Sequence, residues 1–336
     1  MKRILFLLLL LGPIVGTAQT AKDYFDKGYN SYTAKKYAEA IEFYDKAIAL
    51  RDDDPNVYFN RGLAKFYLAQ YSGAIDDFSE TIKLSPNDYE AYYNRGYSKS
   101  ELGNDYGAIS DYEKVLEINP NYKSAWFELA YLEAELEKYA KAKEHYSRYL
   151  ELNPTSINAY FNRGLANKKL KNYTAAMDDF SKTLELDAEY GEAYFQLGFC
   201  LAKLSRHRDA IENYTKYISY YPEDVKAYYN RGISYDDSGD KALAKNDYKK
   251  AIEMKPTYGN AHFNLALLYY DEGSYRLAMD HYSSVIEQEP EAWDAYQERA
   301  WCKHALGMSN EACADWEKAH EFGSKTALNS IEKHCK

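Results

Sequence analysis

The sequence predicts an all-α fold in which one helical hairpin recurs nine times at a fixed spacing. Three series of residues keep this spacing without interruption. The first is an alanine, found at Ala40, Ala74, Ala108, Ala142, Ala176, Ala210, Ala244, Ala278 and Ala312. The second is an aromatic residue four positions after each alanine, from Tyr44 to Trp316. The third is a small residue twelve positions before each alanine, from Gly28 to Ala300. All three series have a period of 34 residues, and a fixed period of this length is typical of repeat architectures.

Each repeat carries two series of apolar or small residues at helical spacing. In the seventh repeat they are Tyr228, Gly232 and Tyr235, then Ala244, Tyr248 and Ala251. These series predict two helices that approach closely at their small residues, with aromatic rings packed around them. A proline that cannot continue the second helix follows in most repeats, at Pro86, Pro120, Pro154, Pro222, Pro256 and Pro290. Because one hairpin cannot bury its own apolar face, neighbouring hairpins are expected to stack into a continuous core.

This pattern resembles the tetratricopeptide repeat, a helix–turn–helix unit of about 34 residues. The resemblance covers nearly the whole chain from Ala21 onward. It implies a right-handed α-solenoid superhelix that binds a protein or peptide partner. The expected units are approximately 21–54, 55–88, 89–122, 123–156, 157–190, 191–224, 225–258, 259–292 and 293–322. A C-terminal capping helix is expected within 323–336, because the last repeat has no neighbour to cover its outer apolar face.

Arginine and aspartate vary together among the repeats. The residue before the small position is arginine in five repeats, and the residue before the second-helix aromatic is aspartate in the same five. The expected pairs are Arg61 with Asp77, Arg95 with Asp111, Arg163 with Asp179, Arg231 with Asp247, and Arg299 with Asp315. The other four repeats lack both residues. This covariation predicts a partly buried ion pair inside each of the five hairpins, which gives the arginines a structural role.

Asparagine recurs one residue after an aromatic residue of the predicted first helix. The candidates for a peptide-binding groove are Asn60, Asn94, Asn162, Asn230 and Asn264, with Phe59, Tyr93, Phe161, Tyr229 and Phe263. The family resemblance places this face in the concave groove, where an amide can both donate to and accept from a peptide bond. The series is broken by Glu128, Gln196 and Glu298. The alternative is that the amides tie adjacent first helices together or belong to the fold consensus.

A carboxylate clamp of the kind found in some relatives is not evident from the sequence. Lys168, Lys169 and Lys226 are placed near the expected groove, but no complete set of lysine, asparagine and arginine stands at the required positions.

The segment 1–18 is predicted to be a cleaved secretory signal. Lys2 and Arg3 precede an apolar run, and the small-residue triplet Gly16-Thr17-Ala18 precedes the expected cleavage site at Gln19. A membrane anchor is the alternative, but a span needs about 20 apolar residues and Pro13 interrupts this run. We therefore expect an exported bacterial protein, periplasmic or extracellular, with no membrane span after cleavage.

The four cysteines are expected to differ in role. Cys313 and Cys335 are placed to form a disulfide that holds the capping helix in an oxidising compartment. Cys200 and Cys302 occupy the same position in different repeats and are expected to pack as small apolar groups. A metal site with His304, His320 and His334 is not expected, because no paired-ligand spacing supports it.

The remaining composition argues against nucleic-acid binding and catalysis. The formal net charge is −10 and no basic stripe is present, which disfavours nucleic acid and anionic membranes. The sequence contains no phosphate-binding loop or nucleophile elbow, so neither an enzyme nor a cofactor is expected. The leading hypothesis is a non-catalytic scaffold that binds an extended peptide or a partner protein on its concave surface. The alternative is a structural subunit of a cell-envelope assembly that docks through its convex face or its ends.

Overall fold

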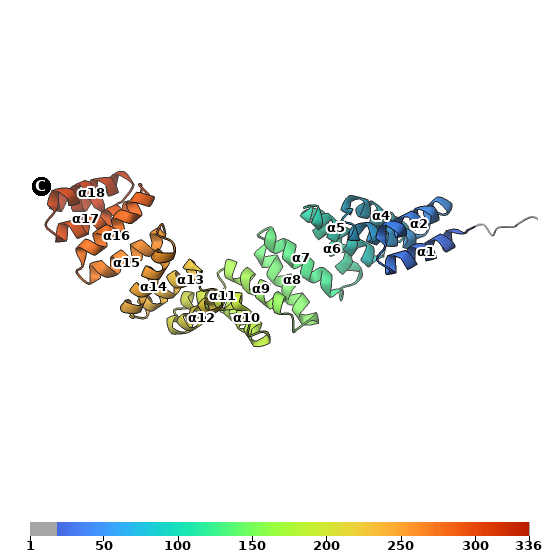
Figure 1. Cartoon of the computed structure of the whole chain (residues 1–336), viewed down its shortest axis with the longest axis horizontal. Coiled ribbons are helices and arrows are strands. Elements are labelled where there is room, and N and C mark those ends of the chain that lie inside the picture. The colour runs from blue at the N-terminus through green and yellow to red at the C-terminus, as the bar shows by residue number, and fades with distance from the viewer. Residues whose placement is uncertain (1–18, 336) are drawn as a thin grey trace, which may run out of the picture. The chain divides into compact units, whose positions relative to one another are not determined.

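The computed structural model describes residues 19–335, so the predicted signal at 1–18 lies outside the described residues. Within that range the chain is all-α and forms a helical-repeat solenoid (Figure 1). The helices are α1 (Ala21–Thr33), α2 (Tyr37–Leu50), α3 (Pro55–Tyr67), α4 (Tyr71–Leu84), α5 (Tyr89–Glu101), α6 (Asp105–Ile118), α7 (Lys123–Glu135), α8 (Tyr139–Leu152), α9 (Ile157–Lys169), α10 (Tyr173–Leu186), α11 (Gly191–Lys203), α12 (His207–Tyr220), α13 (Val225–Asp237), α14 (Lys241–Met254), α15 (Gly259–Asp271), α16 (Tyr275–Gln288), α17 (Trp293–Ala305), α18 (Ser309–Glu321) and α19 (Ala327–His334). Odd-numbered helices up to α17 are the first helices of their repeats, and the following even-numbered helices are the second.

The chain divides into two compact units. Unit 1 ends at Leu152 and contains α1 to α8, and unit 2 begins at Asn153 and contains α9 to α19. Inside each unit, a second helix packs against the first helix of the next repeat, as α4 does on α5 and α10 on α11. First helices of adjacent repeats also contact one another, as α1 does with α3 and α9 with α11. The first helices of each unit therefore form a row of neighbours.

The turn between the two helices of a hairpin uses one left-handed residue in every repeat. Five of these residues are not glycine, namely Lys35, Ala69, Glu137, Lys171 and Ser205, and the other four are Gly103, Gly239, Gly273 and Gly307. A left-handed residue after the helix end lets its amide satisfy a carbonyl of the last turn. The first helices begin with side-chain caps in several repeats, as where Ser156 accepts from the amide of Ala159.

The core of each hairpin is a small residue of the first helix packed on an aromatic ring of the second. A Cβ atom placed on Gly164 would lie 2.7 Å from Cε1 of Phe180, so this contact leaves no room for a side chain in the present packing. The second-helix aromatics are fully buried, and they are Tyr44, Phe78, Tyr112, Tyr146, Phe180, Tyr214, Tyr248, Tyr282 and Trp316. Close approach of two helices at a small residue is what the sequence spacing predicted.

The C-terminal helix α19 packs on α18 and is tied to it by a disulfide between Cys313 and Cys335. Ahead of α19, the hydroxyls of Ser324 and Thr326 both donate to Oε1 of Gln297 on α17, at 2.5 and 2.6 Å. Cys200 and Cys302 are buried free thiols, and burial raises the pKa of the Cys200 thiol to about 11. No helix between residues 19 and 335 has the length and apolar character that crossing a membrane requires.

Candidate functional site

The five arginines all donate hydrogen bonds to the aspartate of their own hairpin. The Nη2–Oδ1 distances are 2.5 Å for Arg61 and Asp77, 2.7 Å for Arg95 and Asp111, 2.6 Å for Arg163 and Asp179, 2.8 Å for Arg231 and Asp247, and 2.8 Å for Arg299 and Asp315. The aspartate side chains are buried, which makes these pairs part of the interior of the repeat.

Four of these arginines also donate a hydrogen bond to a residue of the preceding repeat. Nη1 of Arg61 donates to Asp45 at 2.6 Å, and Nη1 of Arg231 donates to Thr215 Oγ1 at 3.1 Å. Arg95 and Arg299 make the equivalent bonds to Ser79 and Ser283. Each of these four arginines therefore joins three helices, and the hydrogen bonds of its guanidinium group are made within the protein. A fork of fixed donors suits this bridging role better than a single ammonium group does.

A second partner of the buried aspartates was missed in the sequence. Lysine stands four residues after the arginine in three repeats, and its ammonium lies 2.7–2.8 Å from the aspartate in Lys65–Asp77, Lys99–Asp111 and Lys303–Asp315. In the fifth repeat Asn167 donates to Asp179 Oδ2 at 3.0 Å instead. The fourth repeat, which lacks the arginine, pairs Glu133 with His145 at 2.6 Å. The signal for the lysines was their spacing of four residues from the arginine on one helix face.

The amide groups of the candidate asparagines are partly used inside the protein. Nδ2 of Asn60, Asn94 and Asn230 donates to the carbonyl four residues earlier in the same helix, at 2.7–2.8 Å. Nδ2 of Asn264 on α15 donates to the hydroxyl of Tyr229 on α13 at 3.3 Å. That bond is a tie between adjacent first helices, as the alternative to peptide binding expects. Asn162 is partly exposed on α9.

The aromatic candidates beside the asparagines pack mainly on the core. Their rings lie 5.4–5.9 Å from the second-helix aromatic of the same repeat in Phe59–Phe78, Tyr93–Tyr112, Phe161–Phe180, Tyr229–Tyr248 and Phe263–Tyr282. Phe161 is only 7% exposed. Phe59, Tyr93, Tyr229 and Phe263 are half-buried, so part of each of these rings stays accessible.

A row of apolar side chains lies on the first helices at a position that the sequence analysis did not single out. It follows the small residue directly and consists of Tyr29, Leu63, Tyr97 and Tyr131 in unit 1, and Leu165, Phe199, Ile233, Leu267 and Trp301 in unit 2. We call it the apolar row. Tyr29, Tyr131 and Leu267 are 49%, 45% and 37% exposed. The signal in the sequence was an apolar residue directly after the small residue in all nine repeats.

In unit 2 the apolar row passes beside two lysines that carry no acidic partner among the described residues. Lys168 Nζ donates to Gln196 Oε1 at 2.5 Å and lies 5.5 Å from the ring centre of Phe199. Lys203 Nζ lies 5.4 Å from the same ring. Burial, with Lys169 as a further cause, lowers the pKa of Lys168. We call Lys168, Phe199 and Lys203 the lysine centre.

Two acidic residues on first helices of unit 2 have raised pKa values. Asp236 on α13 has a raised pKa, first because it is partly buried and also because Asp237 and Asp271 are near. Burial likewise raises the pKa of Glu298 on α17. Within unit 2 the lysine centre therefore lies on α9 and α11, and these two acidic residues lie on α13 and α17. Among residues 19–335 no cluster of histidine, cysteine, aspartate and glutamate could hold a metal ion.

Sequence-family models match most of the described chain. The model described as TPR repeat matches residues 28–68, and models described as Tetratricopeptide repeat match 89–122, 123–167, 157–190, 192–224, 225–258 and 260–292. The chain belongs to the tetratricopeptide repeat family. Membership supports a role as a protein–protein interaction scaffold, which is the general role of this family.

Three solved structures are similar to large parts of this chain. MamA is 31% identical over 50% of this chain and 92% of its own, with a TM-score of 0.48. YrrB, described as a TPR protein with an unusual peptide-binding site, is 24% identical over 55% of this chain and 95% of its own, with a TM-score of 0.52. The C-terminal part of a TPR protein from Cytophaga hutchinsonii is 18% identical over 82% of this chain and 98% of its own, also at 0.52. No curated protein matches the chain.

Proposed function

We propose that this tetratricopeptide repeat protein is an exported, non-catalytic scaffold that binds an extended segment of a partner protein along the first-helix surface of unit 2. The observation that carries the proposal is the lysine centre beside the apolar row. Two ammonium groups face one aromatic ring there, and no carboxylate of the described chain pairs with them. A partner carboxylate would supply a counter-charge to both lysines, and the partly buried position of Lys168 makes its interaction stronger than that of the exposed Lys203.

The spacing of the repeats suits an extended chain. Packed helices lie about 8–10 Å apart, and an extended peptide advances about 3.3–3.6 Å per residue. Every third residue of the peptide would therefore meet the apolar row of a successive first helix. We expect the partner segment to carry an acidic residue at the lysine centre, with apolar residues placed toward Ile233 and Leu267 beside it.

The asparagines contribute to this proposal through their oxygens. Because Nδ2 of Asn230 is bonded within its own helix, Oδ1 is the atom that remains to accept a hydrogen bond from a peptide amide. Asn264 holds α15 to α13 and is assigned a supporting role.

The proposal is tested by selecting peptides from a random 12-residue display library against the full chain and measuring their affinity by calorimetry. The double variant Lys168→Gln with Lys203→Gln is expected to weaken binding at least tenfold, because the partly desolvated contact of Lys168 is worth about 1.5–3 kcal/mol and the exposed contact of Lys203 adds less than about 1 kcal/mol. The matched control is Lys182→Gln with Lys250→Gln, which removes two lysines of second helices that pair with Glu185 and Glu253. Equal losses in both double variants would reject the lysine centre as the binding site.

A second candidate function is docking of unit 2 through its second helices. Leu243 on α14 and Leu277 on α16 occupy the same position in adjacent repeats, and each is 47% exposed. This pair favours the envelope-subunit alternative. If Leu243→Ser with Leu277→Ser abolishes partner capture while the two lysine substitutions leave it intact, that alternative replaces the first proposal.

Export is proposed from the sequence of residues 1–18, which lie outside the described residues. N-terminal sequencing of the protein recovered from the envelope fraction of a bacterial host is expected to begin at Gln19. A chain that keeps Met1, or that stays in the cytoplasm, would contradict this part of the proposal.

A further inference from the structure

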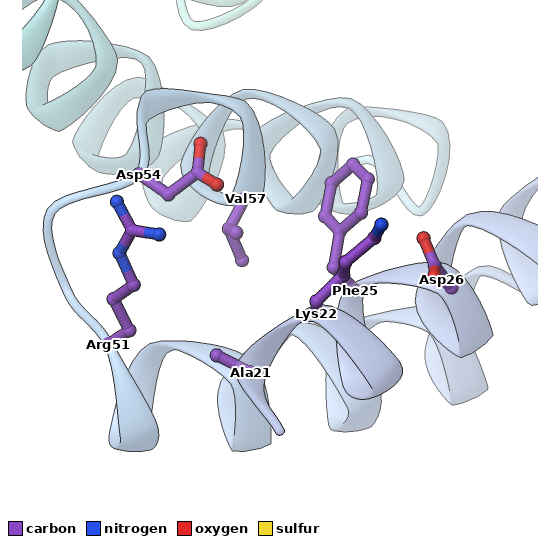
Figure 2. A pocket seen from close by; sticks show the side chains of 7 residues that line it. All are labelled: Ala21, Lys22, Phe25, Asp26, Arg51, Asp54 and Val57. Atoms are coloured by element: carbon purple, nitrogen blue, oxygen red, sulfur yellow. The ribbon is translucent and has the colours of Figure 1, made fainter. Parts of the chain in front are cut away.

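Unit 1 contains a pocket of ≈ 290 Å³ over the ring of Phe25, at the start of the first repeat (Figure 2). Its apolar part is formed by Phe25 and Ala21 of α1 and by Val57 of α3. Arg51 and Asp54 stand at one side, in the segment between α2 and α3, and Lys22 and Asp26 stand at the other (Figure 2). Ligand pockets in proteins measure about 300–1,000 Å³, so this one has the size for a single side chain or a fragment.

Other repeats of the same chain fill the equivalent place with a tyrosine. In the third repeat Tyr122, the last residue before α7, lies 5.3 Å from the ring of Tyr89 and 5.1 Å from that of Tyr93. Tyr89 and Tyr93 occupy the positions that Ala21 and Phe25 hold two repeats earlier. The chain's own Tyr122 therefore covers the surface that the first repeat leaves open.

The same arrangement recurs in two more repeats. Tyr190 lies 4.9 Å from the ring of Phe161, and Tyr258 lies 5.2 Å from the ring of Tyr229. The residue at this position in the first repeat is Asp54, whose carboxylate accepts from the amide and the side chain of Asn56, both at 3.0 Å. Asp54 thus caps α3 and leaves the ring of Phe25 uncovered on the pocket side.

We propose that the pocket over Phe25 binds the side chain of a tyrosine supplied by a partner protein. The occupant is identified by the three places in this chain where a tyrosine already makes the same contact. Edge-on and tilted contacts between two aromatic rings are the arrangements that such pairs prefer.

The charges around the pocket favour a neutral phenol over a charged side chain as the occupant. Two cationic side chains, Lys22 and Arg51, stand with two anionic ones, Asp26 and Asp54, so the lining has no net preference for either sign. Arg51 is already bonded to Asp53 at 2.5 Å. A phenol hydroxyl can donate to a carboxylate and accept from an ammonium group, so it fits a mixed rim. This site is in unit 1 and does not depend on the lysine centre of unit 2.

The test uses N-acetyl-L-tyrosinamide as the probe and saturation-transfer NMR on the full chain. We expect a dissociation constant in the millimolar range for the tyrosine probe, at least threefold lower than that of N-acetyl-L-leucinamide. Asp54→Tyr should weaken binding at least fivefold, because it installs the residue that the third, fifth and seventh repeats use. The control is Asp88→Tyr, which makes the same change at the cap of α5 in the next repeat and should leave binding unchanged.

A second variant guards against a folding defect in the first. Ala21→Tyr introduces the counterpart of Tyr89 without touching the cap of α3, and it should also weaken binding of the probe. Equal binding of the probe to the wild type, Asp54→Tyr and Ala21→Tyr overturns the proposal. So does equal affinity for the leucine and tyrosine probes, an absence of binding to the wild type, or a Phe25 ring that is already covered by the chain's own N-terminal residues.

Discussion

The ion pair between Arg231 and Asp247 should be strongly coupled, and a double-mutant cycle measures that coupling. Nε and Nη2 of Arg231 donate to the two carboxylate oxygens of Asp247 at 2.7 and 2.8 Å. The side chains are 15% and 8% exposed, and the guanidinium also lies over the ring of Tyr228. This pair is a useful choice because the sixth repeat carries Leu197 and Asn213 at the same two positions.

The losses of the two single variants are expected to sum to several kcal/mol more than the loss of the double variant. Arg231→Leu leaves the carboxylate of Asp247 buried without a cation, which should cost about 3–5 kcal/mol of unfolding free energy. Asp247→Asn leaves Arg231 with its bond to Thr215 and some access to water, so the loss should be about 2 kcal/mol. The double variant recreates the pair of the sixth repeat and should lose only about 1–2 kcal/mol, because no unpaired charge remains.

Urea denaturation followed by circular dichroism gives the unfolding free energies. The variants are compared with one common slope of unfolding free energy against urea concentration. Because long repeat arrays can lose two-state behaviour, hydrogen exchange of peptides from α13 and α14 supplies a local measure. We expect a coupling energy of at least about 2 kcal/mol, above the range found for independent sites. Effects that add to within about 0.5 kcal/mol would refute the inference that this pair acts as one buried unit.

Three further predictions concern unit 2. Replacing Cys313 and Cys335 by serine should lower the stability of the C-terminal repeat by about 3 kcal/mol, since the disulfide closes a loop with a sequence separation of 22, and a reductant should not change the melting temperature of that variant. Burial, with His262 as a second cause, lowers the pKa of His281 from 6.5 to about 4. Between pH 4 and pH 6.5 the unfolded chain therefore binds a proton at His281 that the folded chain does not bind. Stability should therefore fall as the pH drops from 6.5 toward 4, and His281→Gln should reduce the slope of denaturation midpoint against pH, whereas an unchanged slope would contradict this. Within the described chain the hydroxyl of Tyr282 is buried without a hydrogen-bond partner, so Tyr282→Phe should change the unfolding free energy by less than about 0.5 kcal/mol, and a larger loss in urea denaturation would reveal a hidden partner.

The fold could be predicted from the sequence because each structural position is observed nine times in one chain. The contact of Gly164 with Phe180 is an example, since a small residue and an aromatic keep their separation in every repeat. Chance patterns do not persist over nine units, whereas a packing requirement does. The same comparison linked arginine to aspartate, because the two residues are present or absent together.

The lysines that join the aspartates could not be found in this way. Lys65, Lys99 and Lys303 stand four residues after an arginine, but Asn167 and Tyr235 occupy that position in the other two arginine-containing repeats. A partner that is present in only some repeats leaves no complete covariation. The spacing of four residues places these lysines on the same helix face as the arginine, and the distances show that a buried carboxylate with four acceptor sites has room for a second donor.

The partners of the asparagine amides also lay beyond the sequence. An amide at a fixed helical position can turn toward its own backbone, a neighbouring helix or the solvent, because its side-chain torsions are not set by spacing. Asn230 turns toward the carbonyl of Lys226, and Asn264 turns toward Tyr229. Residue type alone therefore does not tell which atoms of these side chains are left to bind a peptide.

The positions where the nine repeats differ are the ones that point to partners. A feature shared by all repeats, such as the buried second-helix aromatic, is explained by packing within a hairpin. The lysine centre arises because Lys168 and Lys203 meet at one ring in two adjacent repeats only, and neither lysine has an acidic partner among the described residues. The pocket over Phe25 lies where the first repeat has Asp54 and the third, fifth and seventh repeats have a tyrosine. An internal repeat thus serves as its own control: the shared residues build the solenoid, and a departure that leaves a charge or a ring uncovered marks a surface that a second molecule can complete.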